Sequence, residues 1–347
     1  MKVSVYTIAK NEEQFVKRWY ESCKDADYIF ILDTGSSDKT VELAKELGIN
    51  VEAKIVSPWR FDVARNTALN FIPSDIDFCI ALDMDEVLVS GWRKELEKVD
   101  LSITRPRYQY TWSWKDDGSP SLTYGGDKIH ARNDYLWKHP VHEVITCKEK
   151  EVQGWCGLEI HHFPDSTKSR GQYFPLLQLA VEEDPEDDRN SHYLAREYFF
   201  NNMKEKAKDE FIRHLSLKRA VWRPERSRSM RYLAKCDTDN MYYWLLRAVS
   251  ECPERREPWV DLSLYYYEKN NWESCLSSSL NALSIKEKPL EYLCEEHAWG
   301  YVPYDLAAIS YYNLGMYKKS VEYGEMALKF NPNDERLIVN LEWYNKK

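Results

Sequence analysis

The chain has 347 residues, 43% of them hydrophobic and 14% aromatic, which excludes a largely disordered protein and predicts two domains or one domain and a repeat array. Its 48 basic and 57 acidic side chains give a net charge of -9 and are spread evenly, so no surface for long nucleic acid is expected. The apolar N-terminal run is too short for a transmembrane segment and the eight cysteines form no CxxC pair, so we expect a cytoplasmic protein with reduced thiols.

The first part of the chain alternates between short apolar runs and helical segments. Strands are expected at residues 3–9, 28–32, 51–56 and 78–82, and helices after residue 11 and at 41–47 and 62–71. This alternation is typical of βα units that build a mostly parallel sheet. Ligands of such sheets bind beyond the carboxyl ends of the strands.

Polar side chains follow each of the four expected strands. In chain order they are Asn11 and Glu12, then Asp33, then Trp59 and Arg60, and finally Asp83 and Asp85. Parallel strands bring their carboxyl ends to one edge of the sheet, so these side chains should share one rim. The chain contains neither GxGxxG nor GxxxxGK[ST], which removes the main markers of dinucleotide and P-loop enzymes.

The fourth strand ends in three carboxylates, those of Asp83, Asp85 and Glu86. On an extended backbone Asp83 and Asp85 would point the same way and could converge on one divalent cation or one sugar nucleotide. A turn with helix-capping acids ahead of Trp92 is the structural alternative.

Four motifs together resemble a known family. AKNEE at 9–13, LDTGSSDKT at 32–40, ARN at 64–66 and LDMDE at 82–86 resemble the inverting glycosyltransferases of family 2, which have the α/β GT-A fold. The resemblance implies a nucleotide-sugar donor, with UDP-hexose expected, and Mn²⁺ or Mg²⁺ as the cofactor. It places Thr7, Ala9, Asn11, Glu12, Asp33, Arg65 and Asp83 at the nucleotide, and Asp83 and Asp85 at the metal.

Two of these residues have plain structural alternatives. Asp33 is also a common type of turn residue beside Gly35, and Arg65 could be a solvated residue on a helix surface.

Residues 101–160 are rich in aromatic side chains, and strands are expected at 108–114 and 141–147. Tyr110, Trp112 and Trp114 alternate and should share one face of a strand. Such a stripe could stack on a sugar ring, but packing in the core is the more common role and is favoured here.

The segment WKHPVHE at 137–143 resembles the VHE element of the branch of the family that carries helical repeats. The resemblance implies that Glu143 is the general base that takes the proton of the acceptor hydroxyl. The more usual base of the family, an Asp in an ED pair, is absent in that form. An ion pair between Glu143 and Arg132 is the structural alternative.

His161 and His162 fall where related enzymes place a histidine that completes the metal site. Neighbours in a strand face opposite ways, so only one of them can be the ligand, and we favour His162. A zinc site that also includes His139 and His142 is a competing interpretation, which the short H-x₂-H spacing and the lack of a CxxC pair disfavour.

From residue 169 the pattern becomes helical, and one unit resembles a tetratricopeptide repeat (TPR). Ala248 lies one repeat length of about 34 residues before Ala282, and His214 lies the same distance before Ala248. An insertion around residues 287–298 explains the longer spacing from Ala282 to Ala327. We therefore expect a GT-A domain at 1–168 and a TPR-like helical domain at 169–347.

Two functions fit this organisation. The first is a metal-dependent inverting glycosyltransferase that acts on a glycan, lipid-linked or protein acceptor. The second is a catalytically degenerate GT-A scaffold whose repeats bind a peptide or protein partner. The repeats could bind a peptide, the acceptor or a second copy of the chain, and an array that only extends the catalytic domain is an equal alternative.

Overall fold

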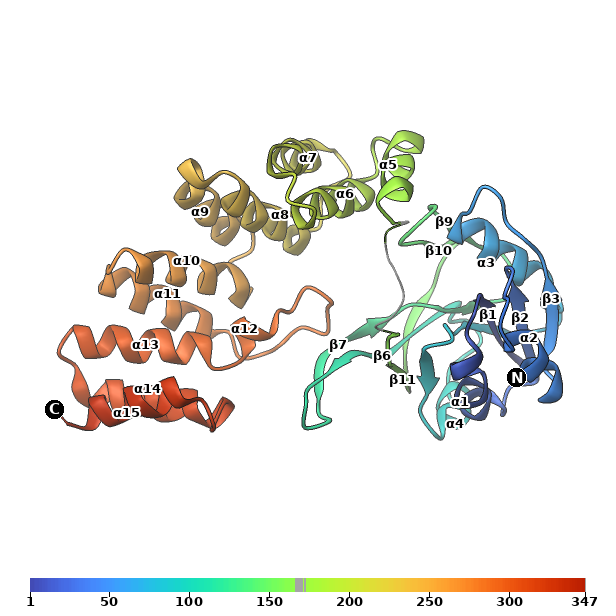
Figure 1. The fold of residues 1–347 in the computed structure, drawn as a ribbon, viewed down its shortest axis with the longest axis horizontal. Helices are drawn as coiled ribbons and strands as arrows, with labels where there is room; N and C mark the ends of the chain where they lie inside the picture. The colour runs from blue at the N-terminus through green and yellow to red at the C-terminus, as the bar shows by residue number, and fades with distance from the viewer. Residues whose placement is uncertain (166–170, 172, 347) are drawn as a thin grey trace. The chain divides into compact units, whose positions relative to one another are not determined.

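The computed structural model describes residues 1–165, 171 and 173–346 (Figure 1). The chain forms two compact units, Met1–Ala180 and Val181–Lys347. Each unit has its own buried hydrophobic clusters. The boundary predicted between residues 168 and 169 lies outside the described residues.

The first unit is built on a five-stranded sheet. Its strands are β1 (Val3–Ala9), β2 (Tyr28–Asp33), β3 (Asn50–Ala53), β4 (Phe78–Ala81) and β8 (Ile129–Ala131), in the order β3-β2-β1-β4-β8. The first four strands run parallel and β8 is antiparallel to β4. The mostly parallel sheet is therefore as predicted, and the carboxyl ends of β1, β2 and β4 share one edge.

Helices cover both faces of this sheet. They are α1 (Glu13–Cys23), α2 (Thr40–Glu46), α3 (Phe61–Asn70) and α4 (Trp92–Leu96). Successive residues of β4 alternate between the two cores, because Ile80 packs with α1 residues and Ala81 packs with α3 residues. Trp19 of α1 is fully buried and donates its indole N–H to the carbonyl oxygen of Leu82 at 3.1 Å, which fixes α1 beneath the end of β4.

A second sheet and a hairpin follow the first sheet in the chain. The sheet has the order β5-β11-β6-β7, from β5 (Glu86–Leu88), β6 (Arg105–Trp114), β7 (Pro120–Gly126) and β11 (Gln153–His162). The hairpin pairs β9 (Tyr135–Lys138) with β10 (Val144–Cys147). β5 joins the two sheets in sequence, because it begins directly after the acidic turn at the end of β4.

The expected strand at 141–147 is shorter in the structure. β10 begins at Val144, because His139 and His142 have positive φ angles of 78° and 49°, which no extended strand allows. Residues 139–143 therefore form a turn that carries Glu143. The third strand is also shorter than expected and ends at Ala53.

The aromatic stripe of β6 is divided between core and surface. Tyr110 is 4% exposed and belongs to the core, as expected, whereas Trp112 is 37% exposed. The pairing of β6 with β7 shifts register between Thr111 and Ser113, which interrupts the simple alternation of faces. The expectation of core packing is thus correct for Tyr110 and wrong for Trp112.

The second unit is helical, and α5 (Tyr173–Glu183) spans the division between the two units. The helices of the second unit are α6 (Asp188–Phe200), α7 (Lys204–Ser216), α8 (Arg223–Cys236), η1 (Thr238–Asn240), α9 (Met241–Glu251), α10 (Arg256–Glu268), α11 (Trp272–Ser284), α12 (Glu296–Trp299), α13 (Val302–Asn313), α14 (Tyr317–Phe330) and α15 (Glu335–Asn345). Successive helices pack in pairs, α6 with α7, α8 with α9, α10 with α11 and α13 with α14. This is the expected TPR-like array.

Equivalent positions in the second helices of these pairs hold small buried residues. Ala248 of α9, Ala282 of α11 and Ala327 of α14 are all fully buried. Small side chains here let paired helices pack closely. His214 of α7, one repeat length earlier, is also fully buried although it is far larger than alanine.

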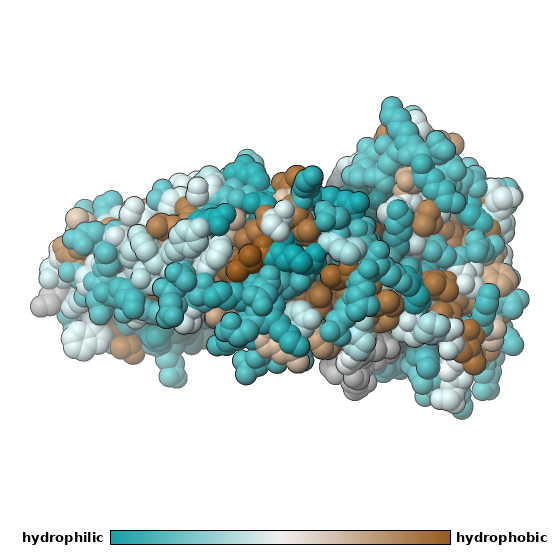
Figure 2. Space-filling model, turned by 90° about the horizontal axis from the view of Figure 1, so that it is seen from above, coloured by the Kyte–Doolittle hydropathy of each residue, from teal (hydrophilic) through white to brown (hydrophobic). Residues whose placement is uncertain are grey.

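No described helix combines the length and the apolarity needed to cross a membrane. Figure 2 shows mostly hydrophilic residues on the visible surface, with hydrophobic residues scattered among them.

Candidate functional site

A cleft of about 580 Å³ lies at the carboxyl ends of the parallel strands in the first unit. Its charged lining residues are Lys10, Glu12, Arg65, Asp83, Asp85, Glu143 and Asp165. Its apolar wall includes Ile8, Val56, Trp59, Phe61 and Tyr173. Of the residues expected on the rim, Glu12, Trp59, Asp83 and Asp85 line this cleft. Asn11, Asp33 and Arg60 do not.

The acidic motif at this cleft is a turn. The backbone N–H of Glu86 donates to the carbonyl oxygen of Asp83 at 2.9 Å, and the Glu86 carboxylate accepts from the backbone N–H of Asp83 at 2.9 Å. The extended backbone expected at Asp83 and Asp85 is wrong, because the strand ends at Ala81 and the two residues lie in a turn. The two carboxylates line the same cleft but have different partners.

Arg65 connects two of the predicted site residues. Its Nη2 donates to Asp83 at 2.7 Å, and its Nε donates to the Glu143 carboxylate. The Arg65 side chain is only 6% exposed and lies over the ring of Trp137, with 4.9 Å from Cζ to the ring centroid. The alternative of a solvated surface arginine is therefore wrong.

The structural partner expected for Glu143 is also different. Arg132 donates two hydrogen bonds to the carbonyl oxygen of Ile72, whereas Glu143 pairs with Arg65. Burial lowers the pKa of Arg65, but the charges of Asp83 and Glu143 outweigh this effect and raise it. The guanidinium is thus a permanent positive charge between two carboxylates.

Asn66 holds the Glu143 turn against α3. Its side-chain amide donates to the carbonyl oxygen of Trp137 and accepts from the backbone N–H of Trp137, both at 2.8 Å. Since Trp137 is in β9, Asn66 fixes the hairpin whose turn carries Glu143. In the motif ARN, Arg65 therefore binds the two acids and Asn66 positions the hairpin.

Lys128 is a site residue that the sequence reasoning missed. Its ammonium donates to Asp83 at 2.8 Å and to Glu86 at 2.6 Å, although it lies more than forty residues downstream of both. The signal for Lys128 in the sequence was indirect. The carboxylates of Asp83, Asp85 and Glu86 follow a buried strand closely, and buried carboxylates require positively charged partners.

Burial alone would raise the pKa of both carboxylates that Lys128 binds. For Asp83, Arg65 and Lys128 outweigh burial and hold its pKa well below the usual range. For Glu86, which is 1% exposed, burial prevails and its pKa is raised. The pKa of Lys128 is raised well above its usual value, because the two carboxylates overcome the opposing effect of burial.

Replacing Lys128 by methionine is expected to lower the free energy of unfolding by about 3–5 kcal/mol, because the buried carboxylate of Glu86 loses its cation, whereas Asp83 keeps Arg65. Urea unfolding at neutral pH measures this loss. The matched control is Lys2→Met, which removes an exposed pair with Asp75 and should cost no more than about 1 kcal/mol. Equal losses in the two variants would contradict the role given to Lys128.

Asp85 lies next to His162. The Asp85 carboxylate is 3.4 Å from Nε2 of His162, and Nδ1 of His162 is 3.0 Å from the carbonyl oxygen of Trp112. A carbonyl oxygen only accepts, so Nδ1 carries the proton in the neutral ring and Nε2 presents its lone pair toward Asp85. The His162 ring also stacks on Trp112, with 4.2 Å between ring centroids.

His161 is placed differently, with its Nε2 3.4 Å from the carboxylate of Glu159.

Burial lowers the pKa of His162, but hydrogen bonds of the protonated ring to Asp85 and to the Trp112 carbonyl reverse this and raise it. Over the part of the chain that the structure describes, His139, His142, His161 and His162 form no metal-binding group.

Not all residues expected at the nucleotide line the cleft. Ala9 and Glu12 do. Asp33 accepts hydrogen bonds from the backbone N–H groups of residues 35 and 36, Asn11 accepts from that of residue 37, and Thr7 is fully buried within β1. Asp33 and Asn11 therefore shape the loop after β2, which is the turn role given above as the alternative for Asp33.

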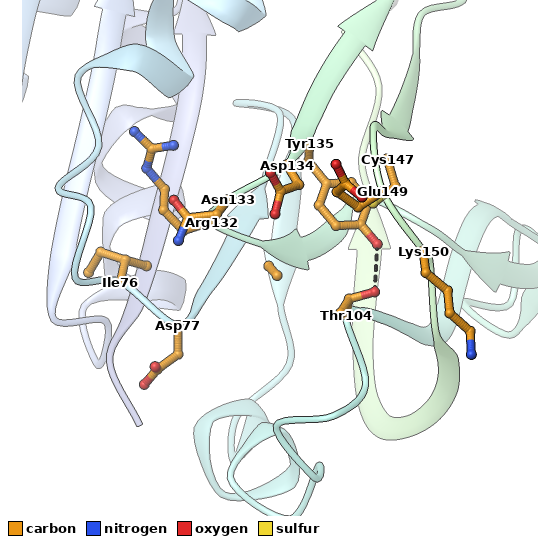
Figure 3. Close-up of a pocket in the computed structure, with 11 residues that line it drawn as sticks. Ile76, Asp77, Thr104, Arg132, Asn133, Asp134, Tyr135, Cys147, Glu149 and Lys150 are labelled. Carbon is orange, nitrogen blue, oxygen red and sulfur yellow. Dashed lines mark hydrogen bonds between the residues drawn. The ribbon is translucent and has the colours of Figure 1, made fainter.

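A second pocket of about 220 Å³ lies at the opposite end of β4 (Figure 3). Asp77, just before β4, and Arg132, just after β8, are among its lining residues. The hydroxyl groups of Thr104 and Tyr135 are 2.9 Å apart in its wall. None of the predicted site residues lines it.

Two known proteins are similar to this chain over more than half of its length. A TPR repeat-containing protein of Synechococcus elongatus is 27% identical over 209 residues, which are 53% of this chain and 49% of that protein. The crystal structure of S. aureus TarS 1-349 in complex with UDP-GlcNAc covers 81% of this chain and 90% of that chain, with 14% identity and a TM-score of 0.38.

The first part of the chain matches a family. An uncharacterized glycosyltransferase of Rickettsia bellii is 33% identical over 108 residues, which are 31% of this chain and 35% of that protein. One from Rickettsia typhi is 33% identical over 108 residues and 36% of its length. The chain thus spans about a third of the length of these curated relatives. The family described as Glycosyl transferase family 2 matches residues 4–100, which carry β1 to β4, and this part of the chain is therefore a domain of that family.

Proposed function

We propose that this chain is a metal-dependent, inverting glycosyltransferase that moves a sugar, expected to be a hexose, from a UDP-sugar to an acceptor. The observation that carries the proposal is the meeting of Asp83, Asp85, Arg65 and Glu143 at one cleft of the first unit, with His162 beside Asp85. Residues 4–100 of this unit match the Glycosyl transferase family 2 model. The apolar wall of the cleft gives a nucleobase a surface to lie on.

Asp85 and His162 suit a divalent cation. An oxygen of Asp85 and Nε2 of His162 lie 3.4 Å apart. Nδ1 is held by a carbonyl oxygen, so in the neutral ring Nε2 has its lone pair available for a cation. Asp83 is a third candidate ligand, and its carboxylate already forms ion pairs with Arg65 and Lys128. Mn²⁺ or Mg²⁺ held there would neutralise the charge that develops on a departing nucleoside diphosphate.

Arg65 is proposed to contact the donor. Its Nη1 is buried and has no hydrogen-bond partner among the residues described, while Nε and Nη2 are occupied. A phosphate or ribose oxygen would satisfy that N–H. Ala9 and Glu12, on the same cleft, are proposed to border the nucleotide as well.

Glu143 is proposed as the general base. One of its carboxylate oxygens accepts from Arg65, and the other has no hydrogen bond within the described part of the chain. The free oxygen would take the proton of the acceptor hydroxyl as the hydroxyl oxygen attacks the anomeric carbon and the nucleoside diphosphate leaves from the opposite face. Arg65 thus aligns the base with the donor.

The acceptor is proposed to be a glycan, a lipid-linked sugar or a protein side chain. The helical repeats, by analogy with other TPR arrays, are proposed to bind a peptide, a protein or a second copy of the chain. The fold alone supports this part of the proposal.

A donor-hydrolysis screen tests the proposed activity. Purified protein is incubated with UDP-, GDP- and dTDP-sugars in Mn²⁺, and the release of nucleotide is followed over time. We expect slow release from a UDP-hexose that stops on chelation. A protein that hydrolyses none of the donors, while binding a peptide through its repeats, would favour the scaffold function instead.

A further inference from the structure

The second unit contains a buried cluster that the proposed transferase does not use. His192 of α6, His214 of α7 and Glu225 of α8 are at most 3% exposed. One potential ligand atom from each lies within 4.8 Å of the other two. Three different helices therefore bring two imidazoles and a carboxylate to one point inside the repeats.

One serine orients both imidazole rings. The Ser229 hydroxyl lies 2.7 Å from Nδ1 of His192 and 3.0 Å from Nδ1 of His214. Its oxygen has two lone pairs and can accept an N–H from each ring. Each histidine then carries its proton on Nδ1, and each Nε2 presents a lone pair, which is the arrangement typical of metal-binding histidines.

Both Nε2 atoms are buried without a hydrogen bond to any described residue. A buried polar atom without a partner is rare and costly, so two in one cluster require an explanation. Nε2 of His214 is 3.5 Å from one carboxylate oxygen of Glu225, while the other oxygen of Glu225 accepts from the hydroxyl of Tyr292 at 3.0 Å. One carboxylate oxygen of Glu225 thus remains close to Nε2 of His214, and a ring nitrogen of His192 lies within 4.8 Å of the ligand atoms of both residues.

We propose that His192, His214 and Glu225 bind one zinc ion that joins α6, α7 and α8. Two imidazole nitrogens and one carboxylate oxygen are donors that zinc accepts. Ser229 and Tyr292 support the ligands by fixing the rings and the carboxylate.

The surrounding charges are compatible with this site. The guanidinium groups of Arg196, Arg228 and Arg189 act electrostatically on His192. The positive charges of these arginines disfavour a zinc ion nearby. Glu225 would contact the ion directly, however, and Arg228 has an acidic partner of its own, since it lies 3.4 Å from the carboxylate of Glu295.

The repeat pattern points to the same residue. His214 occupies the position at which later repeats have the buried alanines Ala248 and Ala282. A histidine at this position needs polar partners on the neighbouring helices, and His192 and Ser229 are there. Zinc would therefore join α6 and α7, the pair in which a histidine stands at the position of the buried alanine of the later repeats.

Zinc binding to the full-length chain tests the proposal. Competition with a chromophoric chelator gives the affinity, and the melting temperature is recorded with and without zinc. Asp85→Asn is the background for all measurements, because it removes a ligand of the proposed donor-metal site. In that background we expect tight zinc binding and a higher melting temperature with zinc.

Variants then locate the ion. His214→Gln should abolish the tight site and the zinc-dependent rise in melting temperature. Ser229→Ala, a smaller change, should weaken binding by about 10–100-fold and serves if His214→Gln does not fold. His297→Gln, a histidine of the same unit outside the cluster, should bind like the parent. No tight site in the Asp85→Asn parent, or unchanged affinity in Ser229→Ala, would overturn the proposal without affecting the proposed transferase.

Discussion

Replacing Glu143 by glutamine is expected to lower kcat by about 10²-fold or more, with little change in the KM of the donor. Glutamine keeps a carbonyl oxygen that can accept from Nε of Arg65, so the local geometry should persist. It cannot take a proton from the acceptor hydroxyl. Steady-state transfer rates at saturating donor and acceptor measure the effect.

The matched control for this change is Glu159→Gln. Glu159 lies on β11, its side chain is 42% exposed, and it does not line the cleft. Its variant should transfer sugar at the parent rate. If Glu143→Gln also stays within about threefold of the parent, Glu143 serves only to hold Arg65 and is not the base.

Replacing Asp85 by asparagine is expected to lower transfer by about 10²–10³-fold and to remove its dependence on Mn²⁺. Asparagine has nearly the same shape as aspartate but no charge, so His162 would be left without its anionic neighbour. Rates measured across a Mn²⁺ titration separate weaker metal binding from a lower maximal rate.

Asp75→Asn is the control for this change, because Asp75 is exposed and pairs only with Lys2 in the hydrogen bonds and ion pairs described. It should leave both the rate and the metal dependence unchanged. Full transfer by Asp85→Asn at saturating donor would exclude Asp85 as a metal ligand.

Local sequence patterns predicted most of the α/β sheet. The apolar runs of β1, β2 and β4 are short, and the first charged residues after them are Lys10, Asp33 and Asp83, so periodicity and turn signals located these strands closely. The helical repeats could be predicted equally well, because alanines that are buried in the structure recur at the repeat length.

The contacts within the site were harder to predict from the sequence. Arg65 and Glu143 are 78 residues apart, and Lys128 is 45 residues from Asp83. No local periodicity joins such pairs, since the fold of the second sheet and the hairpin decides which charges meet. The positive φ angles of His139 and His142 likewise come from tertiary packing and hid the turn that carries Glu143.

Isothermal titration of the protein with UDP, with and without Mn²⁺, tests the central claim most directly. The account predicts binding in the presence of Mn²⁺ that weakens strongly without the ion, and that Asp85→Asn loses this difference. The absence of UDP binding under both conditions would contradict a nucleotide-sugar site at the cleft of Asp83, Asp85 and Arg65.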